Sequence, residues 1–129
     1  MEMGYQRMIV WKKAMDVVVE AYDFVKHLPS DERFALSSQI RRAAVSIPAN
    51  IAEGYCRAFG SQDWYRFVRI ALGSAIELET HLMIVERTRL APVDRINLMR
   101  CRLRDVIGLL YRIVQPSERK GPGANSPDP

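Results

Sequence analysis

The chain has 129 residues, 48% of them hydrophobic, and a net charge of +4. These values indicate one globular domain with a real core. No apolar run reaches about 18 residues, and no charged segment precedes a long apolar one, so we expect neither a membrane span nor a secretory signal. Cys56 and Cys101 have no close partner in sequence, which favours buried or half-buried thiols in a cytoplasmic protein.

The first predicted helix covers residues 8–28. Its apolar residues recur at helical spacing in two adjacent stripes, one containing Trp11 and the other containing Val17. Pro29 ends this helix, because the residue before a proline avoids helical backbone angles. Apolar residues on two sides predict that the helix contacts more than one neighbour.

A second helix is expected to start at a cap provided by Ser30 or Asp31 and to continue to about Arg57. Pro48 lies inside the helical pattern, where it either kinks one helix or separates two. The apolar periodicity continues in phase on both sides of the proline, which favours a single kinked helix. Ser46 is then a candidate to hydrogen-bond the carbonyl that the kink would free.

A third helix follows a turn in which Gly60 suits a left-handed position and Ser61 suits the helix cap. Gly73 lies in the interior of this helix, where glycine costs roughly 1 kcal/mol relative to alanine. We therefore expect close packing of Gly73 against the alanines of the second helix. The predicted core face consists of Trp64, Phe67, Ala71, Ala75, Leu78, Leu82 and Val85.

The fourth predicted helix has Pro92 at its first position, where proline is well tolerated. Pro116 is expected to end it, which leaves a four-helix domain over residues 1–115. Residues 116–129 contain four prolines and no large apolar residue, which is typical of a disordered tail. The predicted core face consists of Val93, Ile96, Met99, Leu103, Val106, Leu110 and Ile113.

The most distinctive stretch is residues 38–54, SQIRRAAVSIPANIAEG, which is rich in small residues and apolar on two sides. Together with VWKKAMDVVVEAYDF upstream and ALGSAIELETHL downstream, it resembles the four-helix-bundle family of 23S rRNA-intervening sequence proteins. This family is more distantly similar to the accessory variability proteins of diversity-generating retroelements. The similarity covers about residues 8–115 and implies a ring-like homopentamer. RNA or a nucleic-acid-processing protein is the partner that we associate with it.

The basic residues concentrate in the last quarter of the domain. Residues 87–115 contain seven arginines and two aspartates, a net charge of +5. Arginine binds phosphate and carboxylate groups in two-pronged fashion. The alternative is that these arginines pair with Glu77, Glu79 and Glu86 of the third helix. The candidate nucleic-acid contacts are Arg89, Arg95, Arg100, Arg102 and Arg104.

Polar residues on the second and third helices form another candidate cluster. Asn50, Glu53 and Arg57 share one edge of the second helix, which is open either to a partner or to a packing role. We expect Glu77 or Glu79 to reach Arg41 or Arg42, because an acidic helix attracts a basic one as its neighbour. The full set is Arg41, Arg42, Asn50, Glu53, Arg57, Glu77 and Glu79.

Catalytic and metal sites have little support in the sequence. Glu77, Glu79 and His81 invite a metal interpretation, but no Glu-x-x-His pair of the kind found in di-iron bundles occurs. Neither cysteine is spaced for pairing with a histidine base, and there is no glycine-rich phosphate loop. We therefore expect no cofactor, no metal and no enzymatic activity.

The predicted fold is an all-α, up-and-down, left-handed four-helix bundle whose second helix is kinked at Pro48. Its two-sided apolar helices predict a homo-oligomer. The predicted function is that of a non-enzymatic, RNA-associated accessory protein. The alternative is a structural or protein-interaction scaffold that does not bind nucleic acid. Arg100, Arg102 and Arg104 distinguish the two: a solvent-facing cluster favours RNA, and burial against Glu77 or Glu79 favours the scaffold.

Overall fold

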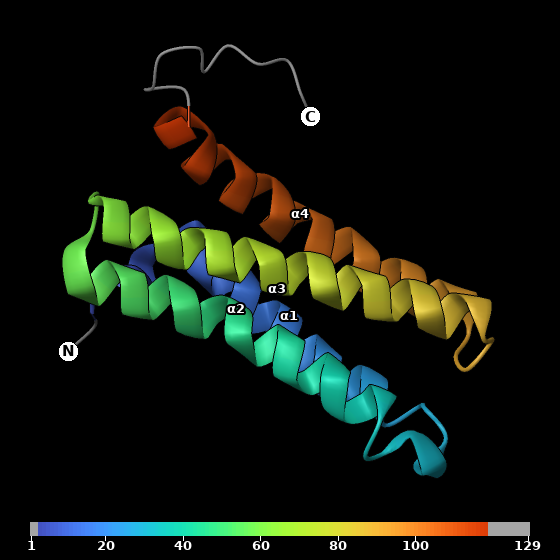
Figure 1. Cartoon of the computed structure of the whole chain (residues 1–129). Coiled ribbons are helices and arrows are strands. Elements are labelled where there is room, and N and C mark those ends of the chain that lie inside the picture. The colour runs from blue at the N-terminus through green and yellow to red at the C-terminus, as the bar shows by residue number, and fades with distance from the viewer. Residues whose placement is uncertain (1–2, 119–129) are drawn as a thin grey trace.

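The computed structural model describes residues 3–118 and contains four α-helices joined by short turns (Figure 1). The helices are α1 (Ile9–Val25), α2 (Leu36–Ala58), α3 (Gln62–Arg87) and α4 (Val93–Glu118). Two short 3-10 helices, η1 (Gly4–Arg7) and η2 (Ser30–Glu32), precede α1 and α2. The described chain contains no β-strand, so the predicted all-α fold is confirmed. No helix in this part is long and apolar enough to cross a membrane.

The four helices form a bundle with four sides. α2 and α4 each pack against both α1 and α3, whereas α1 and α3 face each other only across a diagonal. Sequential helices run in opposite directions, which gives the predicted up-and-down topology (Figure 1). α4 stays close to α3 near their shared turn and then diverges from it (Figure 1). The left-handed packing of the bundle stays a prediction.

Most of the predicted core residues are buried. All seven residues of the α3 core face are less than a tenth exposed. On α1, the stripe that contains Val17 is buried, but the stripe that contains Trp11 is only partly covered. Met15 and Tyr22 of that stripe are exposed to 38% and 48%. Within one chain, α2 and α4 cover two sides of α1 and leave this outer edge open.

The start of α2 differs from the prediction. Ser30 begins the 3-10 turn η2 and does not cap a long helix, and α2 starts only at Leu36. Ala35 adopts φ −115° and ψ −101°, which lies outside the helical region and separates the two elements. The cap predicted at Ser30 or Asp31 was therefore wrong. Charge and capping chemistry near Pro29 predicted a helix start but not the length of the turn before α2.

Pro48 lies inside α2, which continues as one helix from Leu36 to Ala58. The alternative of two separate helices is therefore excluded, while the kink itself stays a prediction. Ser46 does not take the predicted role of binding the freed carbonyl. Its hydroxyl lies 2.7 Å from the Ser74 hydroxyl on α3 and accepts a hydrogen bond from the Asn50 side chain. The hydroxyl thus connects two helices.

The glycine required for close helix packing is Gly54 of α2. A Cβ atom at this position would lie 2.6 Å from Cβ of Phe67 and 3.1 Å from Cε3 of Trp64. The close approach predicted at Gly73 was wrong, because no atom lies within 4 Å of the position its Cβ would occupy and the residue is exposed. Gly73 is therefore on the exposed surface of α3.

The turn between α2 and α3 follows its predicted chemistry. Gly60 has φ +85°, the left-handed conformation that glycine adopts without strain. The Ser61 hydroxyl accepts a hydrogen bond from the Trp64 amide at 3.3 Å and donates one to the Ala58 carbonyl at 2.6 Å. Tyr55, Phe59 and Trp64 make ring contacts around this turn. These ring contacts pack the end of α2 against the start of α3.

The predicted end of the fourth helix was wrong by three residues, because α4 continues through Pro116 to Glu118. Proline always lacks an amide hydrogen, but it only disfavours helical angles in the residue before it. The last turn of a helix can therefore include a proline. Most of the predicted tail, residues 119–129, lies outside the described residues. Its disorder stays a prediction.

Candidate functional site

Two of the candidate arginines on α4 contact carboxylates on α1. Nε of Arg102 lies 3.1 Å from Glu20, and the guanidinium of Arg95 lies 3.8 Å from Asp23. Lys13 of α1 makes a reciprocal pair with Asp105 of α4 at 3.6 Å. The charged residues on these facing sides of α1 and α4 therefore neutralise one another along the contact.

Two further arginines contact the acidic side of α3. Nε of Arg104 lies 3.1 Å from Glu79, and Arg100 lies 3.3 Å from Glu86 and 3.9 Å from Glu79. The Arg100 and Glu79 side chains are only 22% and 20% exposed. Partial burial makes such pairs stronger than fully exposed ones, because water screens the charges less. Arg100 and Arg104 thus help to hold α4 against α3.

Arg89 differs from the other candidates because its backbone has the defining role. It adopts φ 57°, in the left-handed region, two residues after the end of α3. Its amide donates to the Glu86 carbonyl at 3.1 Å, and the Leu90 amide donates to the Val85 carbonyl at 3.1 Å. This pair of hydrogen bonds is the Schellman arrangement that closes a helix. The Arg89 side chain is exposed beside the turn.

The α4 arginines do not form one surface. Arg95 and Arg102 are directed to α1, whereas Arg100 and Arg104 are directed to α3. Four basic side chains that look clustered in the sequence are therefore divided between two contacts and matched by carboxylates. Their alternating positions in the helix explain the division, since neighbouring residues in a helix point about 100° apart.

The pairing predicted between α2 and α3 was wrong. Glu77 pairs with His81 at 3.1 Å, and Glu79 pairs with arginines of α4. Glu79 lies on the side of α3 that faces α4, whereas α2 packs on the other side. Glu77 does line a groove with Arg42, but its carboxylate contacts His81. Among residues 3–118, Arg41 and Arg42 have no ion pair with a carboxylate. Helical periodicity predicted one basic and one acidic helix, but it did not predict which side of each helix faces the other.

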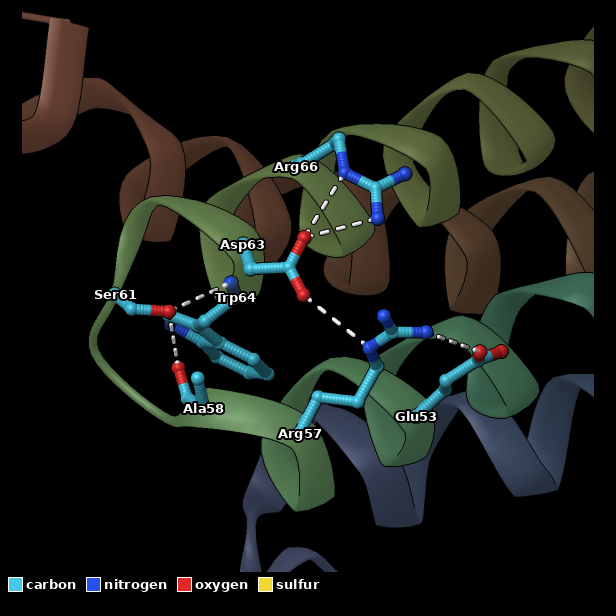
Figure 2. A network of polar contacts seen from close by, with 7 residues as sticks. All are labelled: Glu53, Arg57, Ala58, Ser61, Asp63, Trp64 and Arg66. Atoms are coloured by element: carbon cyan, nitrogen blue, oxygen red, sulfur yellow. Dashed lines mark hydrogen bonds and ion pairs between the residues drawn. The ribbon is translucent and has the colours of Figure 1, made fainter.

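The other part of the polar cluster surrounds the α2–α3 turn, as Figure 2 shows. Arg57 bridges the two helices, with Glu53 at 3.6 Å on α2 and Asp63 at 3.2 Å on α3. Asp63 also accepts hydrogen bonds from Arg66 at 2.9 and 3.1 Å. All four side chains are at least a third exposed. Their arrangement ties the helix ends together at the surface.

Asn50 has a packing role within α2. Its amide nitrogen donates to the Ser46 carbonyl at 2.8 Å and to the Ser46 hydroxyl at 3.0 Å. The contact between Ser46 and Ser74 was not predicted. The only signal for it in the sequence is that each serine lies among small residues, where two helices can approach closely.

No residue group resembles a catalytic or metal centre in the part of the chain that is described. Within residues 3–118, no three His, Cys, Asp or Glu side chains are grouped as metal ligands. Cys56 and Cys101 are free, and both are exposed, contrary to the burial predicted for them. They lie on the exposed faces of α2 and α4.

The fold agrees with comparisons to known proteins. A crystal structure of a protein of unknown function from the S23 ribosomal protein family of Bacteroides thetaiotaomicron superposes with a TM-score of 0.75. The two sequences are 28% identical, and the match covers 82% of this chain and 98% of the other. No match was found among curated proteins. Residues 6–112 match the family described as 23S rRNA-intervening sequence protein, so the chain belongs to this family.

Proposed function

We propose that this chain is a non-enzymatic helical scaffold that assembles with copies of itself. The observation that carries the proposal is the internal pairing of the α4 arginines. Arg100 and Arg104 contact Glu79, and Arg102 contacts Glu20, so these cations stabilise helix packing. A dedicated nucleic-acid surface would present them to solvent without acidic partners. The scaffold alternative therefore has more support than RNA binding through α4.

Exposed apolar side chains support assembly of several copies. On α1, Val19 is 67% exposed and lies one turn from Met15, which is 38% exposed. On α3, Ile76 and Met83 are 50% and 38% exposed. Apolar surface of this kind usually marks a protein contact.

The two apolar strips lie on helices that occupy opposite corners of the bundle. Their outward faces therefore point in different directions, and one copy can offer the α1 strip to the α3 strip of the next. Contacts between two different surfaces close into a ring when the rotation fits. We propose a ring of five copies, the size that the family resemblance implied.

Light scattering of the purified full chain at micromolar concentration tests the assembly. We expect a mass several times 14.8 kDa for the unaltered protein. Val19→Lys and Ile76→Lys should each lower that mass, since each places a charge in one of the two contacting strips. Leu98→Lys, on the exposed side of α4, is the matched control and should leave the mass unchanged. A mass of one chain for the unaltered protein would rule out self-assembly.

The non-enzymatic part of the proposal is supported by the environment of the candidate nucleophiles. Both cysteines are exposed on different helices, and His81 is engaged by Glu77. A nucleophilic mechanism needs a thiol or hydroxyl within hydrogen-bond reach of a base that a third group orients. The described residues offer no such set.

RNA association is a second candidate function, and one observation favours it. Arg41 and Arg42 are adjacent cations that have no carboxylate partner in the described chain, in contrast to Arg95, Arg100, Arg102 and Arg104. Assembly would repeat them in every copy and increase avidity for a polyanion. Binding of a mixed RNA at low and physiological salt tests this function. Absence of binding at low salt would leave the scaffold function alone.

A further inference from the structure

A groove between α1 and α2 brings the two unpaired arginines to the surface. It has a volume of about 440 Å³. Arg41 is half-buried in it, and Arg42 is exposed at its edge. A second groove of about 290 Å³, on the α3 side of α2, is lined by Arg42 and Ser46 as well. The lining residues of the first groove are Tyr22, Ser38, Arg41, Arg42, Val45 and Ser46.

The charge of this groove is not balanced by the protein. No residue lining the α1–α2 groove is acidic. Glu77 lines the neighbouring groove together with Arg42 but makes no ion pair with it, and its carboxylate contacts the His81 ring at 3.1 Å. Lys26 lies one helical turn after Tyr22 and so adds another cation to the same side of α1. The groove thus combines positive charge with the hydroxyl groups of Ser38 and Tyr22.

This combination fits phosphate groups. Guanidinium and hydroxyl groups are the donors that most often bind phosphate oxygens. Arg41 and Arg42 are neighbours in a helix, and neighbouring side chains diverge. They are therefore poorly placed to grip a single phosphate together and better placed to contact successive phosphates of one strand that runs across α2.

Tyr22 adds a feature that distinguishes a single strand from a duplex. Tyr22 is 48% exposed and lies at the α1 side of the groove. An exposed aromatic ring beside cations is the arrangement by which proteins stack unpaired bases while holding the backbone. We infer that the α1–α2 groove binds single-stranded RNA, with Arg41 and Arg42 on its phosphates and Tyr22 against a base. The inference rests on the RNA association proposed as the second candidate function.

Fluorescence anisotropy with a labelled oligouridine of about 16 nucleotides tests the inference on the full chain. Binding is measured between about 50 mM and about 200 mM salt. Arg41→Gln/Arg42→Gln should weaken binding at least about tenfold and reduce the slope of log affinity against log salt by about 1.4, the share of two phosphate contacts. Tyr22→Leu should weaken binding at least about fivefold with little change in that slope.

Arg102→Gln/Arg104→Gln is the matched control, because it removes the same charge from a region where carboxylates neutralise it. It should change affinity by less than about twofold. Equal weakening in both double variants would contradict RNA binding in the α1–α2 groove. It would indicate that the RNA is attracted by the net charge of the whole chain. If Arg41→Gln/Arg42→Gln leaves RNA binding unchanged, the protein binds RNA elsewhere than in the α1–α2 groove. The inference would then be wrong, although the RNA-associated function would stand.

Two other outcomes would also overturn the inference. If the unaltered protein does not bind the oligouridine or mixed RNA at low salt, both the groove and the second candidate function fail. If Arg41→Gln/Arg42→Gln lowers the assembled mass in light scattering, the two arginines serve contacts between copies. Circular dichroism of each variant establishes that its helical content is retained, so a loss of binding is attributable to the altered side chains.

Discussion

Arg89 occupies a backbone position that suits glycine. A residue with a Cβ in the left-handed region costs roughly 1–2 kcal/mol, whereas glycine adopts it freely but loses more entropy on folding. Because Arg89 has φ 57°, we expect Arg89→Gly to raise the free energy of unfolding by about 0.5–1 kcal/mol. Urea unfolding followed by circular dichroism at fixed protein concentration measures this change.

Arg87→Gly is the control for Arg89→Gly, since it removes the same charge two residues earlier, at the last residue of α3. There glycine has no conformational advantage, and we expect a loss of up to about 1 kcal/mol, the penalty of glycine in a helix interior. Two substitutions of the same type should therefore have opposite signs. Destabilisation by both would contradict the left-handed closing turn at Arg89.

Glu79 is the acidic residue on which two α4 arginines converge, at 3.1 Å from Arg104 and 3.9 Å from Arg100. Glu79→Gln should lower the free energy of unfolding by about 1 kcal/mol, because Arg100 is mostly covered and keeps only Glu86. Glu53→Gln, at an exposed pair within α2, should change it by less than about 0.5 kcal/mol. Equal effects of the two substitutions in urea unfolding would show that α4 is held without this contact.

At the scale of the element, Gly54 and Gly73 differ in whether a neighbouring helix packs against them. Gly54→Ala should destabilise the bundle by about 1–3 kcal/mol, because its Cβ would meet Cβ of Phe67, which is fixed to the α3 backbone. Gly73→Ala has open space around it and should stabilise α3 by up to about 1 kcal/mol. Thermal unfolding of both variants at one concentration measures the difference. A stable Gly54→Ala variant would mean that α2 and α3 pack less closely.

The elements themselves were mostly predictable because their signals are local. The α3 core face follows from helical spacing, and the Gly60–Ser61 turn follows from backbone and capping chemistry. The start of α2 was not predictable, because the short helix η2 forms where the first turn of α2 was expected. The packing role of Gly54 depends on where α3 crosses α2, which no periodicity in either helix specifies.

The candidate site was less predictable, because it depends on pairing between helices. Seven arginines in residues 87–115 indicate a basic surface in the sequence, but their neutralising partners, such as Glu20 and Asp23, come from a helix about 80 residues earlier. Arg41 and Arg42 show the converse. They were expected to pair with α3 and have no such partner in the described chain, so the charge that is available for a ligand lies on another face of the molecule.

Assembly of the whole molecule makes a further prediction about its stability. If only folded copies associate, the midpoint of thermal unfolding rises with protein concentration, by up to about 1.4 kcal/mol per chain for each tenfold increase. We expect this rise for the unaltered protein and for Leu98→Lys between about 1 and about 100 µM. It should be absent in Val19→Lys, whose charge disrupts the α1 strip. A midpoint independent of concentration in the unaltered protein would contradict assembly, because it would show that contacts through the apolar strips on α1 and α3 add no stability to the folded chain.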